Sequence, residues 1–67
     1  MVTKIEVAMS ALEKLRVERG DHFLRTQASG SLQCAMGKHL DKDGPYHMGE
    51  ISEATINQAR KRILEGK

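Results

Sequence analysis

Apolar residues recur every three or four positions along the N-terminal part of the chain. This spacing places them on one face of a helix, and they are Ile5, Ala8, Met9, Leu12 and Leu15. Thr3 and Glu6 have the spacing of a capping box. Gly20 follows the last turn, where glycine commonly ends a helix. The pattern therefore predicts a helix over about residues 4–19.

A second amphipathic pattern lies near the other end of the chain. Ser52 is a favourable N-cap residue, and Ile51 and Ile56 have the spacing of a hydrophobic staple. The aliphatic face continues to Ile63, and Gly66 follows as a residue that ends helices. This pattern predicts a helix over about residues 53–65.

The middle of the chain, residues 21–50, has a weaker pattern. Its apolar positions also step by three and four, which favours helix, at Leu24, Ala28, Leu32, Ala35, Met36 and Leu40. Ser31 is placed to cap a short helix over about residues 31–40. The alternative is an α+β fold with a hairpin over about residues 23–36 that turns at Ser29-Gly30, but its strands would hold few β-branched residues. We therefore expect an all-α, three-helix domain over residues 1–67.

The composition indicates a small core and a modest charge. The chain has 67 residues, a net charge of +2, and very few aromatic residues. Self-association is expected, because a dimer buries more apolar surface per chain. Cys34 is the only cysteine, so no disulfide forms within the chain, as in a reducing compartment. Without an apolar run of membrane-spanning length or a secretory signal, we expect a cytoplasmic protein.

Residues 51–64 resemble the turn and recognition helix of bacterial helix-turn-helix regulators. An aliphatic residue and a serine precede a helix that carries a threonine, polar residues and then basic residues. The resemblance implies contacts with duplex DNA from Ser52, Thr55, Asn57, Gln58, Arg60, Lys61 and Arg62. The sequence departs from the family upstream, because Pro45 would break the preceding helix. An ordinary capped helix with a solvated basic face is the simpler interpretation.

Neither a metal site nor a catalytic site is expected. If Gly44 is the sixth position of a calcium loop, His39 takes the first position, where aspartate is needed, and Pro45 takes the seventh. Cys34, His39 and His47 lack the paired spacing of a zinc site. We expect Cys34 to be a small core residue. No set of nucleophile, base and orienting group is visible, so we expect a non-enzymatic protein without a cofactor.

Valines and methionines suggest a protein-binding surface. Two valines lie off the main apolar face of the first predicted helix, which would give that helix a second apolar face. Methionine side chains adapt to a partner, and the candidate contact residues are Val7, Met9, Val17, Met36 and Met48. A net charge of +2 is low for a nucleic-acid binder. We therefore favour a homodimeric protein-interaction module, an adaptor or inhibitor, over the alternative of a DNA-binding transcriptional regulator.

Overall fold

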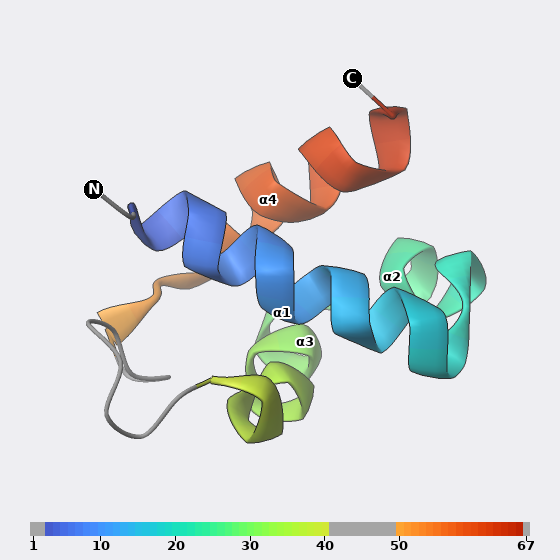
Figure 1. The fold of residues 1–67 in the computed structure, drawn as a ribbon, viewed down its shortest axis with the longest axis horizontal. Helices are drawn as coiled ribbons and strands as arrows, with labels where there is room; N and C mark the ends of the chain where they lie inside the picture. Colours follow the sequence, from blue (N-terminus) through green and yellow to red (C-terminus); the bar gives the residue numbers. More distant parts are fainter. Residues whose placement is uncertain (1–2, 41–49, 67) are drawn as a thin grey trace.

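The described part of the chain is helical throughout. The computed structural model describes residues 3–40 and 50–66. These residues form α1 (Lys4–Arg19), α2 (Asp21–Thr26), α3 (Ser29–Met36), the 3-10 turn η1 (Gly37–His39) and α4 (Glu53–Glu65). Figure 1 shows α1 crossing the molecule, with α4 on one side of it and α3 on the other. The prediction of a small all-α fold is confirmed, and the alternative hairpin over 23–36 is wrong, since those residues lie in α2, in α3 and in the short link between them.

The two outer helices begin and end where the sequence predicts. Thr3 caps α1, because its Oγ1 accepts a hydrogen bond from the backbone N–H of Glu6 at 3.3 Å. Gly20 ends α1 with a φ of +89°, a conformation that glycine adopts without strain. Ser52 caps α4 by accepting from the N–H of Thr55 at 3.3 Å. Gly66 ends α4 in the left-handed conformation.

The middle region folds into two short helices where we expected one. Helix α2 begins directly after Gly20, and Gln27 and Ala28 are extended and separate it from α3. The predicted helix over about 31–40 begins earlier, at Ser29, and its α-helical part ends at Met36. A six-residue helix buries one residue, Leu24, so its periodicity is too short to recognise in a sequence.

The core is small and lies where the four α-helices meet. Helix α1 makes its most extensive contacts with α4, and α3 packs on both of these helices. The buried apolar side chains are Ala8, Ala11, Leu12, Leu15, Leu24, Leu32, Met36, Ile51, Ile56, Ala59 and Ile63. Every buried side-chain nitrogen and oxygen in the described part of the chain has a hydrogen-bond partner. No helix there is both long enough and apolar enough to cross a membrane.

Polar contacts attach the N-terminal part of α3 to the start of α4. Ser29 Oγ donates to Glu53 Oε1 at 2.9 Å. Gln33 Nε2 donates to the carbonyl oxygen of Ile51 at 2.8 Å, in a partly buried position. These two bonds orient α4, whose exposed face carries the candidate functional residues.

Candidate functional site

An open groove lies between α2 and α4. We call it the α2–α4 groove; it has a volume of about 580 Å³ and is lined by Arg25, Asn57, Arg60, Lys61, Leu64 and Glu65. Arg25 comes from the last turn of α2. The other five residues come from α4, where steps of three and four place them on one side of the helix. The groove therefore depends on how α2 packs against α4.

Arg60 joins the two walls of the groove. Its Nη1 donates to the carbonyl oxygen of Leu24 at 3.4 Å and to that of Gln27. These carbonyls belong to the end of α2, where backbone oxygens lack partners within the helix and carry partial negative charge. The cationic guanidinium satisfies them and fixes the end of α2 against α4.

The same arginine orients a neighbouring amide. Arg60 Nη2 donates to Asn57 Oδ1 at 2.5 Å. Because a guanidinium only donates hydrogen bonds, the amide oxygen has to face Arg60. The Nδ2 group of Asn57 then has two N–H donors that this contact does not use.

The charge of the groove is positive. Three basic residues and one acidic residue, Glu65, line it. This excess of two positive charges equals the net charge of the whole chain, +2. The groove thus concentrates the positive charge of a chain that is otherwise nearly balanced, and it presents this charge to anions.

The structure brings together three of the seven residues predicted to contact nucleic acid. Asn57, Arg60 and Lys61 line the groove. Ser52 and Thr55 instead serve the cap of α4, where their hydroxyl oxygens lie 3.1 Å apart. The remaining two, Gln58 and Arg62, are exposed outside the groove lining.

Three lining residues, Arg25, Leu64 and Glu65, were not predicted as site residues. Leu64 and Glu65 continue the side of α4 that carries Asn57 and Lys61, so the helical repeat could have indicated them. Arg25 is distant from α4 in sequence, and it reaches the groove because α2 packs on α4. No local pattern in the sequence indicates that placement.

The predicted protein-binding residues do not form one surface. Met36 is fully buried in the core, so its prediction as a surface contact is wrong for this fold. Val7 and Met9 are half-buried and pack against the core. Val17 is 86% exposed. Met48 lies outside the described residues.

The expected second apolar face of α1 is therefore absent from the structure. Residues three, four and seven positions before Val17 share its side of the helix. They are Lys14, Glu13 and Ser10, and all three are exposed. Val17 is a single apolar side chain on a polar face.

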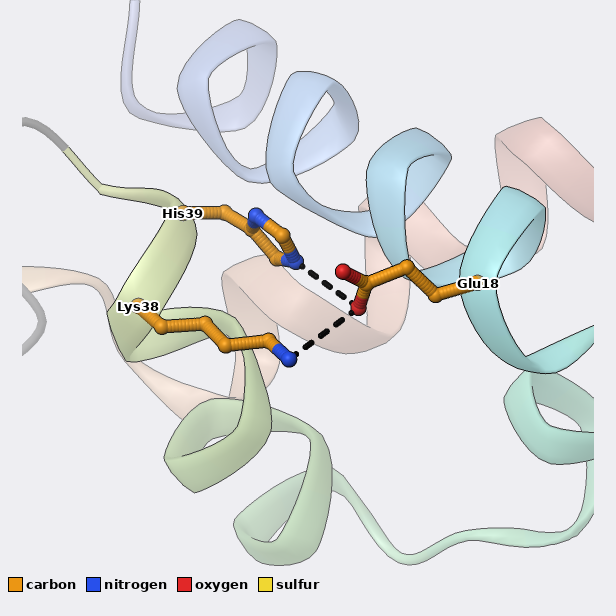
Figure 2. Close-up of polar contacts among 3 residues, drawn as sticks. All are labelled: Glu18, Lys38 and His39. Carbon is orange, nitrogen blue, oxygen red and sulfur yellow. Dashed lines mark hydrogen bonds and ion pairs between the residues drawn. The ribbon is translucent and has the colours of Figure 1, made fainter.

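A second polar cluster joins the C-terminal end of α1 to η1. Figure 2 shows Lys38 and His39 pointing toward the carboxylate of Glu18. Lys38 Nζ and His39 Nε2 each lie 3.2 Å from Glu18 Oε1. The hydrogen bond with His39, followed by that with Lys38, lowers the pKa of Glu18 from its ordinary value of 4.5. The cluster holds η1 against α1.

The described residues offer no group of three or more histidine, cysteine, aspartate and glutamate side chains that could hold a metal ion. Cys34, expected in the core, is exposed on α3. The calcium-loop positions 41–49 lie outside the described residues.

Comparison with models of protein families finds no match, and no curated protein or solved structure matches the chain significantly.

Proposed function

We propose that the protein is a small, non-enzymatic nucleic-acid-binding module that contacts the backbone of duplex DNA through the α2–α4 groove. One observation carries the proposal: Arg25, Arg60 and Lys61, from two helices far apart in the sequence, surround a single open groove. Lysine and arginine side chains bind DNA by neutralising phosphates and releasing counterions.

The position of the groove on α4 supports the same function. Asn57 and Lys61 are exposed on one side of α4, and a helix of this kind fits the width of the major groove of B-DNA. The N-terminal cap uses Ser52 and Thr55, so the polar side chains beyond the cap remain for a ligand.

The small positive charge predicts modest affinity and a shallow salt dependence. Arg60 is occupied by the carbonyls of α2, which leaves Arg25 and Lys61 as the main phosphate ligands. Each neutralised phosphate contributes a slope of about −0.9 in a plot of log K against log salt, so we expect a total slope of about −2.

Two adjacent variants on α4 test the proposal. Lys61→Gln and Arg62→Gln each remove one positive charge from an exposed position, but only Lys61 lines the groove. Lys61→Gln should weaken binding and reduce the salt slope by about 0.9, whereas Arg62→Gln should retain most of the affinity. Fluorescence anisotropy with a labelled duplex over a salt series measures both. Equal effects of the two variants, or no binding at low salt, would contradict the proposal.

A second candidate is a protein-interaction module that self-associates. The observation that favours it is Val17, a large apolar side chain that is 86% exposed. In this proposal a second copy of the chain covers Val17 and adds to the apolar surface that a small core buries.

A further inference from the structure

We infer that Arg60 strengthens DNA binding through Arg25, by fixing the end of α2 so that Arg25 and Lys61 can contact one DNA backbone together. The inference rests on the proposed function and assigns a positioning role within the α2–α4 groove. It follows from the two carbonyl oxygens that Arg60 binds, because these belong to residues on either side of Arg25.

The backbone around Arg25 is bonded to α4 at two points. Arg60 Nη1 donates to the carbonyl oxygen of Leu24 at 3.4 Å and to that of Gln27. Leu24 immediately precedes Arg25 and Gln27 follows it by two residues, so these bonds bracket the turn that carries the Arg25 side chain. Arg25 itself is exposed, and the direction in which its side chain reaches therefore depends on where this backbone lies.

Helix α2 is too short to hold that position by itself. It has six residues, its N-cap residue Gly20 makes no side-chain cap bond, and it buries one residue, Leu24. A helix of this length is unstable in isolation, so its order depends on tertiary contacts. A charge-assisted hydrogen bond to carbonyls at a helix end is a strong contact of this kind. Arg60 is therefore expected to decide how firmly Arg25 is placed.

The guanidinium of Arg60 is also held from the side of α4. Its Nη2 donates to Asn57 Oδ1 at 2.5 Å, one helical turn away. A guanidinium presents its N–H donors in a fixed planar arrangement, so bonds to Asn57 and to the carbonyls together set α2 relative to α4. Lys61 needs no such support, because it belongs to α4. We therefore expect Arg60 to act as a unit with Arg25 and independently of Lys61.

A double-mutant cycle tests this dependence. Affinity for a labelled duplex is measured by fluorescence anisotropy for Arg60→Met, for Arg25→Gln and for the double variant. Arg60→Met alone should weaken binding by about tenfold, as the loss of a charged contact does, but it should cost much less in the Arg25→Gln background. Two contacts that act independently would instead give losses that multiply. Multiplying losses would overturn this inference and leave the proposed function standing, whereas absence of wild-type binding at low salt would overturn both.

Two controls separate positioning from general effects. Arg62→Met removes the same charge from an exposed position outside the groove lining and should retain most of the affinity. A second cycle combines Arg60→Met with Lys61→Gln, and here the losses should multiply, because the position of Lys61 does not depend on α2. Equal coupling in the two cycles would indicate a general loss of structure and would contradict the inference.

Circular dichroism below the melting temperature checks that each variant is folded. If Arg60→Met does not fold, Arg60→Lys takes its place in both cycles. Arg60→Lys keeps the positive charge, but an ammonium group lacks the planar fork that bonds two carbonyls and an amide in one geometry. A wild-type affinity for Arg60→Lys would show that the charge alone suffices and would overturn the inference.

Discussion

The guanidinium of Arg60 donates a hydrogen bond to the carbonyl oxygen of Gln27, a residue 33 positions earlier in the chain. The sequence places this residue in a basic run, Arg60-Lys61-Arg62, which suggests three equivalent surface charges. In the structure the three side chains differ. Arg60 is half-buried and bonded to α2, Lys61 lines the groove, and Arg62 is exposed outside it. Neighbours in sequence thus have separate roles, because consecutive helical residues point in different directions.

Replacing Arg60 should therefore cost stability. Arg60→Met keeps much of the length of the side chain but leaves the carbonyls of Leu24 and Gln27 without their donor. We expect a loss of about 1–3 kcal/mol in the free energy of unfolding, as for hydrogen bonds to charged groups. Arg62→Met, the control, should change it by no more than about 0.5 kcal/mol. Urea denaturation measures both, and an unchanged midpoint for Arg60→Met would show that the contact contributes nothing.

At the scale of elements, the contact between α1 and η1 depends on one carboxylate. Glu18 pairs with both Lys38 and His39, whereas Glu13 pairs with Arg16 within α1. Glu18 is thus a link between two elements that are separated by α2 and α3 in the chain. This makes it the position at which pH should act on the packing of η1.

The sign of the pH dependence follows from the lowered pKa of Glu18, caused first by the hydrogen bond with His39. A carboxylate whose pKa is depressed on folding stabilises the fold above its unfolded pKa, here near 4.5, and this contribution is lost as the pH falls through the folded pKa. Glu18→Gln should therefore lower the melting temperature at neutral pH.

The difference between Glu18→Gln and the wild type should shrink well below pH 4.5, where the wild-type carboxylate becomes protonated. Glu13→Gln, which removes a carboxylate from a pair within α1, serves as the control and should have a smaller effect at neutral pH. Melting temperatures of the wild type and of both variants, measured at neutral pH and well below pH 4.5, check these expectations. A Glu18→Gln difference that is unchanged in acid would exclude the carboxylate as its cause.

At the scale of the whole molecule, the core is small, so contact with a partner chain would add to the stability of the fold. The buried side chains come from four α-helices and from Ile51 before α4, and they include Ala8, Ala11 and Ala59, which bury little area. A domain of this length gains limited stability from its own core. In the second candidate function, self-association adds to this limited stability, and Val17 lies in the contact between the two copies.

Light scattering over a range of concentrations tests this self-association. If Val17 lies in the contact between copies, the wild type should show the mass of a dimer, and Val17→Glu should shift the protein toward the monomer by burying a charge. Ala54→Glu, which introduces the same charge at an exposed position on α4, should leave the mass unchanged. A wild type that is monomeric at every concentration would eliminate the second candidate and leave the nucleic-acid proposal untouched.

Much of the fold could be predicted from the sequence. The all-α class, the bounds of α1 and α4 and the caps at Thr3, Ser52 and Gly66 all follow from it. These features depend on side-chain periodicity and on hydrogen bonds between residues three or four positions apart, so the information is contained in short segments. For the candidate site, the same local pattern identified the basic side of α4, with Asn57 and Lys61 on it.

Only the tertiary structure decided which of these residues act together. The break between α2 and α3, the burial of Met36 and the exposure of Cys34 depend on how the short helices pack against α1 and α4. The placement of Arg25 beside Lys61, and the binding of Arg60 to carbonyls of α2, join residues more than thirty positions apart. Such contacts depend on tertiary packing, which can override local preferences and is not encoded in any one segment. The helices were therefore readable from the sequence, whereas the groove between them was not.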